Sequence, residues 1–304
     1  MPLSPPLLDA FHARTPIRAG SLTVTIFGDA VAPRGGELSL ASLVEIMAAF
    51  RIGPGVVRTA LSRLVAEGWF ERRRLGRSSF YRLSATGRAA FDAATEKIYG
   101  GAHHRWDGAF AMVFLEQNGG RGQARAKLEA LGFGAISPDL LIAPTDLADV
   151  RVETGVRLEA RPVEAEAARR LAERAWPLAA LAERYRGFVQ LFAPARGSLE
   201  AAAPADLDAL VVRVLLIHEY RRIVLRDPLL PRELLPQPWA GDEARRLCGT
   251  IYRALVPPAE RWLDAHATTE SGPLPPPARG FLERFGDLQS AQNVTKKLDV
   301  THLP

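Results

Sequence analysis

Arginine is the residue type with the clearest chemical signal in this sequence. Eleven lysines and arginines lie in residues 51–105, against four acidic residues, so this segment carries a net charge of +7. The whole 304-residue chain carries +5, and residues 1–50 and 106–304 carry −1 each. A cluster of cations on an otherwise balanced chain attracts phosphate groups. The charge distribution therefore indicates a nucleic-acid-binding segment, with a general preference for arginine in this chain as the alternative.

The sequence around these arginines predicts a helix with a face that suits a DNA groove. Pro54 fits the first turn of a helix that runs to about Glu67, and Gly68 ends it. At 100° per residue, its apolar side chains share one narrow face, namely Val57, Leu61 and Leu64. The opposite arc is small, hydroxyl-bearing or cationic, and includes Arg58, Thr59, Ser62 and Arg63. A recognition helix needs such a face, because a carboxylate there would repel phosphate. An ordinary amphipathic surface helix is the alternative.

The preceding segments predict a second helix close to this one. Apolar residues indicate a helix over 21–31, with Gly28 and Asp29 marking its end and a turn at 33–36. A short strand over 37–39 and a helix over 40–50 follow, and residues 51–53 break the chain before Pro54. The order is helix, tight turn, helix.

A basic hairpin is predicted directly after the recognition helix. Aromatic residues in 69–74 and 79–83 flank a turn at 75–78 that contains Gly76. We expect its polar and aromatic side chains to contact the DNA backbone or minor groove, namely Arg72, Arg73, Arg74, Arg77 and Tyr81. A helix over 84–99, capped by Ser84, completes the pattern. This order is typical of a winged helix-turn-helix that binds double-stranded DNA, with a solvated charged face as the alternative.

The motifs in these segments resemble a known family. Residues 21–30 (SLTVTIFGDA), 33–36 (PRGG) and 57–69 (VRTALSRLVAEGW) are similar to the PaaX-type repressors of phenylacetate degradation. Residues 218–222 (HEYRR), 225–228 (LRDP) and 230–231 (LP) resemble the C-terminal signature of the same family. The resemblance covers roughly residues 20–300.

Membership would imply an α+β protein of three domains. These are an N-terminal winged helix-turn-helix over 1–105, a ferredoxin-like α/β domain over 106–176, and a mostly helical dimerisation and effector domain over 177–304. The resemblance further implies a homodimeric repressor that binds a two-fold operator. It also implies release from the operator by an aryl-acyl-CoA, typically phenylacetyl-CoA, as effector.

The pattern of the middle segment agrees with a split β-α-β unit. It predicts a strand over 108–115, a helix over 121–131, strands at 140–142 and 150–158, and a helix over 163–175. In the family this domain resembles the fold of a small CRISPR-associated nuclease, whose functional aspartate ends the first strand. Here that position reads Glu116-Gln117-Asn118, and Asp107 precedes the strand. A structural or dimer-forming role is therefore expected, with a metal-dependent nuclease or a non-specific nucleic-acid-binding protein as alternatives.

The helix predicted over 209–225 is apolar on all sides, which indicates burial. Charged side chains on a buried helix need partners. One hypothesis makes this region the effector site, formed by His218, Tyr220, Arg221, Arg222 and Arg226, in which arginines bind the CoA phosphates. The alternative is a set of internal salt bridges to Glu219, Asp227 or Glu233.

Composition and motifs exclude several other classes. One cysteine, Cys248, excludes a disulfide framework and a multi-cysteine zinc site. No apolar run reaches the ~18 residues of a membrane span, and the N-terminus lacks a secretion signal, so we expect a cytoplasmic protein. Nucleophile-elbow, Walker, dinucleotide and zincin motifs are absent, and the spacing of His103, His104 and Asp107 does not favour a metal site. The sequence thus predicts no catalytic residues, no metal and no cofactor.

Overall fold

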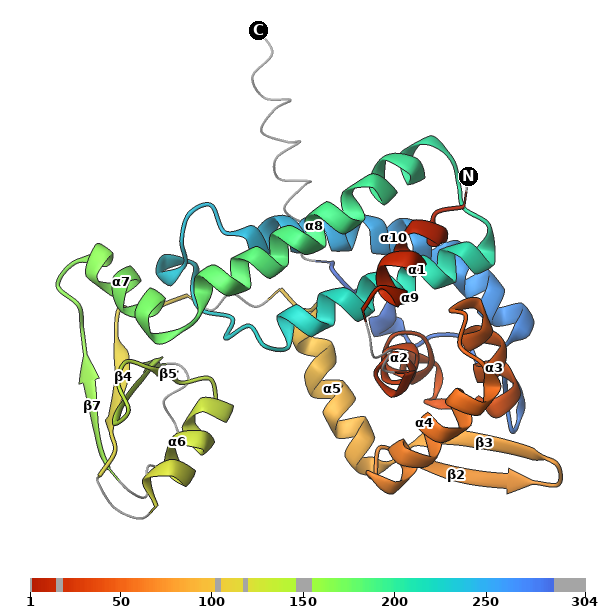
Figure 1. Ribbon diagram of the computed structural model, residues 1–304, viewed down its shortest axis with the longest axis horizontal. Coiled ribbons are helices and arrows are strands. Elements are labelled where there is room, and N and C mark those ends of the chain that lie inside the picture. The colour runs from red at the N-terminus through yellow and green to blue at the C-terminus, as the bar shows by residue number, and fades with distance from the viewer. Residues whose placement is uncertain (1, 15–18, 102–104, 117–119, 146–154, 287–304) are drawn as a thin grey trace, which may run out of the picture. The chain divides into compact units, whose positions relative to one another are not determined.

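The computed structural model describes residues 2–14, 19–101, 105–116, 120–145 and 155–286, and Figure 1 shows the order of their elements. Helices carry most of these residues, and small antiparallel sheets carry the strands. The predicted α+β class is therefore confirmed. None of the described helices combines the length and apolar character that crossing a membrane requires.

Four helices of the N-terminal hundred residues lie close to their predicted positions, namely α2 (Ala19–Ile26), α3 (Leu40–Ala49), α4 (Pro54–Ala66) and α5 (Ala85–Tyr99). A further helix, α1 (Ser4–His12), was not predicted. The α2 segment does not end at Gly28, because the chain continues in a wider π-helical turn over Phe27–Val31. A Cβ atom at Gly28 would lie 2.6 Å from Cε1 of Phe91, so glycine permits this close approach to α5.

The predicted hairpin is present as part of a three-stranded sheet. Its strands are β1 (Glu37–Ser39), β2 (Phe70–Leu75) and β3 (Ser78–Leu83), in the order β1-β3-β2. Gly76 makes the turn with φ 57°, a conformation that favours glycine. The register pairs Arg72 with Tyr81 and Glu71 with Arg82. Because side chains alternate along a strand, Arg72 and Arg74 share one face of the ribbon with Phe70, and Arg73 lies on the other.

A four-stranded sheet follows in the middle of the chain. Its order is β5-β6-β4-β7, with β4 (Phe110–Phe114), β5 (Gly134–Ala135), β6 (Leu140–Pro144) and β7 (Val156–Ala160). Helix α6 (Arg121–Ala130) contributes to a core with this sheet, in which Val113, Leu128 and Leu141 are buried. Helix α7 (Ala165–Ala175) follows β7. The strand expected over 150–158 begins at Val156, and residues 146–154 lie outside the described range.

The C-terminal part is helical, as predicted, but also contains a small hairpin that the sequence analysis missed. The long helices are α8 (Leu178–Ala201), α9 (Asp206–Val224) and α10 (Ala240–His266). Two-residue strands β8 (Thr268–Thr269) and β9 (Gly272–Pro273) pair directly after α10. This hairpin packs against β1, so the end of the chain reaches the N-terminal sheet.

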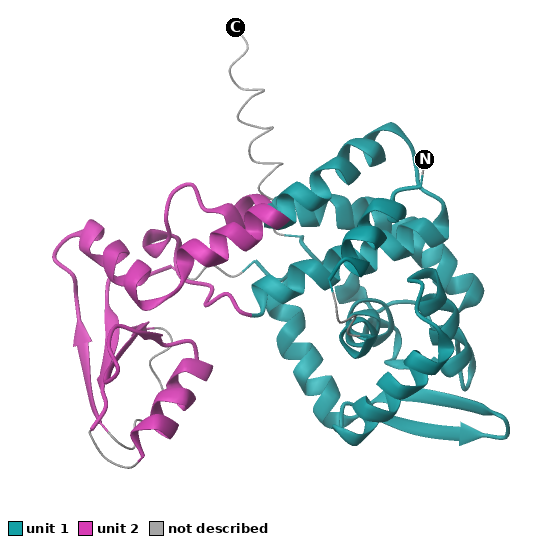
Figure 2. Cartoon of the chain, in the orientation of Figure 1, with its two compact units in different colours: residues 1–101, 188–225, 244–304 teal, residues 102–187, 226–243 magenta. Residues whose placement is uncertain are grey.

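Packing divides the chain differently from the three predicted domains. Unit 1 contains residues 1–101, 188–225 and 244–304, and unit 2 contains residues 102–187 and 226–243 (Figure 2). Most of the segment assigned to a separate C-terminal domain therefore packs with the N-terminal helices in one unit.

Asp29 explains why distant segments share unit 1. Its buried carboxylate accepts hydrogen bonds at Oδ1 from the hydroxyls of Tyr99 (2.7 Å) and Tyr252 (2.9 Å). Arg213 donates to Oδ2 at 2.7 Å, and Arg284 donates to Oδ1 at 3.0 Å. Burial raises the pKa of both tyrosines, which keeps them protonated as donors. A buried carboxylate without such partners is strongly destabilising, so the N-terminal core needs residues from α5, α9, α10 and the C-terminal segment.

Candidate nucleic-acid interface

Helix α4 is held against the core by its apolar face. Val57 and Leu61 are fully buried and Leu64 is nearly so, and the helix packs against α2 and α3. The ring of Phe27 also lies 4.4 Å from that of Phe70, at the start of β2. Figure 1 shows α4 beside the β2–β3 ribbon, and its opposite face is directed toward solvent.

All four α4 residues predicted to contact DNA are exposed, namely Arg58, Thr59, Ser62 and Arg63. The Arg63 guanidinium donates to Glu67 at 2.6 Å, and this hydrogen bond and charge raise its pKa. The Thr59 hydroxyl donates to a backbone carbonyl one turn earlier, at 3.0 Å. Within the described residues, Arg58 has no ion-pair partner. On the exposed face of α4, Arg63 is therefore ion-paired with Glu67, whereas Arg58 has no such pair among the described residues.

Three of the hairpin arginines are exposed without an acidic partner in the described part of the chain. Arg72 donates to the hydroxyl of a serine on the facing strand at 3.1 Å, and Arg74 donates to the turn carbonyl at 3.3 Å. Arg77 has neither a hydrogen bond nor an ion pair among the described residues. These three cations are available to phosphate.

Arg73 and Tyr81 differ from the other predicted contacts. Nη1 of Arg73 lies 2.9 Å from Oε2 of Glu270, a residue of the C-terminal hairpin that sequence reasoning did not single out. Tyr81 is only 4% exposed, because its position in β3 faces the apolar core with Leu83. We therefore exclude Tyr81 from the candidate interface.

The predicted effector residues on α9 partly face α2. His218 is buried, and its Nδ1 lies 2.9 Å from the Thr25 hydroxyl. Burial, with the nearby charges of Arg221, Arg222 and Arg14, lowers the pKa of His218 to about 3. The imidazole is therefore neutral at pH 7.

Arg221 is half-buried with neutral oxygen partners. Its Nε donates to the Thr25 hydroxyl at 2.8 Å, and its Nη2 donates to the carbonyl and hydroxyl oxygens of Ser21, both at 2.8 Å. Burial is the main reason why the pKa of Arg221 is lowered to about 10. These contacts join α9 to α2 and include none of the carboxylates that the salt-bridge hypothesis named.

The remaining predicted effector residues have different surroundings. Tyr220 is buried and packs near the ring of Phe188, 5.5 Å between centroids. Arg222 is exposed and lies 3.5 Å from Glu219, which matches one of the proposed internal salt bridges. Arg226 is exposed and belongs to unit 2.

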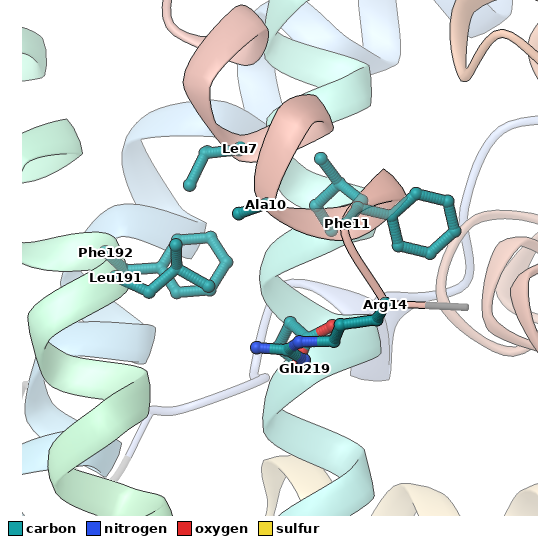
Figure 3. A pocket seen from close by; sticks show the side chains of 8 residues that line it. Leu7, Ala10, Phe11, Arg14, Leu191, Phe192 and Glu219 are labelled. Atoms are coloured by element: carbon teal, nitrogen blue, oxygen red, sulfur yellow. The ribbon is translucent and has the colours of Figure 1, made fainter. Parts of the chain in front are cut away.

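A small pocket lies between α1, α8 and α9, as Figure 3 shows. Its lining is mostly apolar and consists of Leu7, Ala10, Phe11, Arg14, Leu191, Phe192, Leu215 and Glu219. Arg14 and Glu219 form an ion pair in its wall. The pocket encloses about 200 Å³ including its open mouth, and its interior has room for about one water molecule. Any larger group would require its walls to move.

Sequence reasoning missed the buried charges of unit 1. Arg213 lies in the apolar run of α9 with its side chain fully buried between Asp29 and Glu260. Its position between Val212 and Val214 was a usable signal, because an arginine inside an otherwise apolar helix requires a buried acid. Asp29 gave no such signal, since Gly28 and Asp29 together also fit a turn.

The structure holds no group of ligands suited to a metal ion among its described residues. The carboxylate of Asp107 accepts the Ala109 N–H at 3.0 Å. The pKa of Asp107 is lowered first by the Thr145 hydroxyl and then by this backbone hydrogen bond, so the carboxylate is already hydrogen-bonded within the protein. His103, His104, Gln117 and Asn118 lie outside the described residues.

Family models and a full-length relative identify the proteins to which this chain is similar. The chain matches the family model described as "PaaX-like protein" over residues 18–87, and "PaaX-like protein C-terminal domain" over 176–265. The "Transcriptional repressor PaaX" of Escherichia coli (strain K12) is 38% identical over 305 residues, which cover 94% of this chain and 96% of that protein. A solved structure, "Uncharacterized protein Rv0674 from Mycobacterium tuberculosis", is 25% identical, with a TM-score of 0.49 over 72% of this chain and 89% of its own.

The matched segments contain both motif blocks on which the resemblance was based. The first includes α2 to β3 with the exposed face of α4, and the second includes α9. The E. coli relative is a repressor, which indicates a regulator of transcription and not an enzyme. With near full-length similarity to that repressor, this chain belongs to the PaaX-like protein family.

Proposed function

We propose that this protein is a DNA-binding transcriptional repressor whose residues 1–105 form a winged helix-turn-helix. Helices α3 and α4 are the helix-turn-helix, α4 lies in a major groove, and the β2–β3 ribbon is the wing on the adjacent backbone. One observation carries this proposal. The exposed face of α4 and the tip of the ribbon bring Arg58, Arg72, Arg74 and Arg77 to the surface without acidic partners among the described residues.

The proposal assigns residues 106–176 to a ferredoxin-like domain and 177–304 to the helical domain. The strand order β5-β6-β4-β7 with antiparallel neighbours supports the first assignment. In a β-α-β-β-α-β unit the second helix lies between the last two strands, and here residues 146–154 between β6 and β7 lie outside the described range.

The effector in this proposal is an aryl-acyl-CoA such as phenylacetyl-CoA, and the controlled genes serve phenylacetate degradation. The family resemblance supports this part. Arg222 and Arg226 are the exposed cations of the proposed effector set, and guanidinium groups are suited to bind phosphates. His218 and Tyr220 are buried and contact a ligand only in a rearranged state. The effector then releases DNA by favouring an arrangement whose two winged helices no longer match the half-sites.

A two-fold operator requires a homodimer, and β7 offers the means to form one. It is an outer strand of its sheet, and no described strand pairs with its free edge. Val156 and Leu158 are 55% and 50% exposed on one face of this edge strand, so exposed apolar side chains accompany the unpaired edge.

The sequence of β7 is complementary to itself. In antiparallel pairing about a two-fold axis at Leu158, Arg157 lies opposite Glu159 of the partner subunit, and the same ion pair forms again across the axis. The two copies of Leu158 meet at the axis. We therefore assign the dimer contact to the free edge of β7.

The test of the repressor function is an anisotropy titration against the promoter of the protein's own operon, with scrambled DNA of equal length as control. Each titration is run at near-physiological salt with and without phenylacetyl-CoA. Tight promoter binding that the ester abolishes is the expected result. Equal weak binding to both DNAs would reject sequence-specific repression in favour of general nucleic-acid binding.

The same titration tests the effector residues. Arg222→Ala should need more ester for release while leaving promoter affinity nearly unchanged, because Arg222 is exposed and lies outside the helix-turn-helix. Release by phenylacetyl-CoA at the wild-type concentration would remove Arg222 from the effector site. Tight binding that the ester does not alter would keep the repressor and reject the acyl-CoA effector.

A further inference from the structure

Arg73 is set apart from the other wing arginines by its partner, Glu270. The two residues are 197 positions apart in the chain, and their charged groups lie 2.9 Å from each other. Arg73 is 66% exposed, whereas Glu270 is only 19% exposed. The carboxylate is therefore the fixed member of the pair, and the guanidinium is the accessible one.

Three hydrogen bonds fix the C-terminal hairpin at the root of the wing. The Thr268 backbone N–H donates to the Ser42 hydroxyl and the Thr268 hydroxyl to that of Ser39, each at 3.0 Å. The Glu270 N–H donates to the carboxylate of Glu37 in β1 at 2.8 Å. Glu270 is thereby held beside the wing by its own backbone.

Carboxylates lie on one face of the wing only. On the face that carries Arg73, the Arg82 guanidinium lies 2.7 Å from Glu71. The pKa of Arg82 is raised by Glu71 first, and then by Glu37 and Glu270. The opposite face carries Arg72 and Arg74, whose hydrogen bonds in the described structure go to neutral oxygens. The wing thus has a neutralised face and a cationic face.

We propose that Glu270 sets the affinity of this protein for DNA by withholding Arg73 from phosphate. The inference rests on the proposed DNA-binding function. A guanidinium that is paired with Glu270 has less charge to offer a second anion, so loss of the Glu270 charge frees Arg73 for a phosphate of the bound duplex. Glu270 in the hairpin at 268–273 then competes with DNA phosphate for Arg73, so the wing makes one phosphate contact fewer than its arginines allow.

The test is the salt dependence of promoter binding by Glu270→Gln. This variant keeps the backbone hydrogen bond of residue 270 and removes only the charge. We expect tighter binding than wild type, with a slope of log K against log[salt] that is steeper by about 0.9. Between 50 and 200 mM salt the affinity ratio of variant to wild type should therefore fall by about 3.5-fold.

Two controls separate this effect from net charge. Glu200→Gln makes the same charge change on α8, where Glu200 lies near Arg196, and should leave the slope at its wild-type value. The double variant Glu270→Gln with Arg73→Ala should also lose the added slope. Arg73→Ala alone should bind with nearly wild-type slope, whereas Arg77→Ala should make the slope shallower by about one.

Each outcome of these titrations either supports or overturns the role of Glu270. Weaker binding by Glu270→Gln would mean that the hairpin supports the wing and would overturn the proposal, as would an unchanged slope. If Glu270→Gln fails to fold, the comparison of Arg73→Ala with Arg77→Ala decides, and equal losses of slope would overturn it. A wild-type protein that binds no promoter DNA would instead refute the function on which the inference rests.

Discussion

His218 and Asp29 are both buried in unit 1, but their surroundings favour different charge states. Asp29 accepts hydrogen bonds from two guanidinium groups and two phenols, all of which stabilise a carboxylate. His218 has cationic neighbours, of which Arg14 and Arg222 share Glu219. Protonation would add a further positive charge where burial already opposes it. Unit 1 therefore contains one site built for a negative charge and one built to exclude a positive charge.

The His218 site predicts a loss of stability in mild acid. The unfolded histidine has a pKa near 6.5 and the folded one a pKa of about 3. Between these values the unfolded state binds more protons, so the free energy of unfolding falls as pH falls, by about 1.4 kcal/mol per pH unit from this residue. Urea denaturation at pH 7, 6 and 5 measures the slope.

The comparison for this prediction is His218→Gln, which cannot titrate. Its free energy of unfolding should depend less on pH over the same range, by about 2 kcal/mol between pH 7 and pH 5. All other groups contribute equally to both proteins, so the difference belongs to residue 218. Parallel pH profiles would contradict the buried neutral imidazole.

Among the elements, α4 carries the proposed interface, and its arginines differ in their surroundings. Arg58→Ala should weaken promoter binding by about 1–3 kcal/mol, because Arg58 is exposed and has no ion-pair partner among the described residues. Circular dichroism and the Tm should stay at wild-type values, since the side chain leaves no buried gap. Anisotropy titration measures the affinity.

Arg196→Ala on α8 is the matched control for this change. Arg196 is exposed in a helix and lies 3.7 Å from Glu200, so the variant loses the same charge away from the wing. It should bind the promoter almost as tightly as wild type. An Arg58→Ala protein with normal circular dichroism and unchanged affinity would remove α4 from the interface.

The sequence predicted the N-terminal elements well because local signals determine them. Pro54 begins α4, Gly76 makes the ribbon turn, and Ser84 caps α5 by accepting the Gly87 N–H at 2.9 Å. The π-helical turn over Phe27–Val31 was not predicted, since Gly28 and Asp29 also fit the end of a helix. The C-terminal hairpin was also missed, because strands of two residues have no periodicity.

The candidate site was predictable in its residue types and in the exposed face of α4, but not in its long-range contacts. The spacing on α4 identified the exposed arc, since one turn of helix determines which side chains share a face. It did not reveal that Tyr81 faces the core or that Arg73 has a partner 197 positions away. The division into two units was equally hidden, because it follows from long-range pairs such as Arg213 with Asp29.

At the scale of the whole molecule, the proposed self-pairing of β7 can be tested by reversing its charges. Arg157→Glu should disrupt the dimer, because the new carboxylate at this position would face Glu159 of the partner subunit twice. The double variant Arg157→Glu with Glu159→Arg restores opposite charges across the axis and should restore the dimer. Sedimentation velocity over a range of concentrations gives the oligomeric state.

The single variant Arg157→Glu and the double variant with Glu159→Arg have different outcomes if the proposed interface is wrong. A double variant that remains monomeric would count against charge pairing across β7, and Glu159→Gln alone would show what loss of the 3.0 Å pair with Arg161 contributes. A dimer that survives Arg157→Glu would place the interface elsewhere on the molecule. Loss of promoter affinity in step with loss of the dimer would link the two-fold axis to the operator.

The partners of Asp29 have a consequence for how the protein is made. Synthesis proceeds from the N-terminus, so the carboxylate emerges from the ribosome 184 residues before Arg213 and 255 residues before Arg284. Throughout that interval the early helices can bury only part of their core, and contacts between such distant residues form slowly. A nascent chain therefore cannot complete unit 1 before Arg284 has been synthesised, so we expect unfinished copies to lack a stable form of the proposed DNA-binding surface.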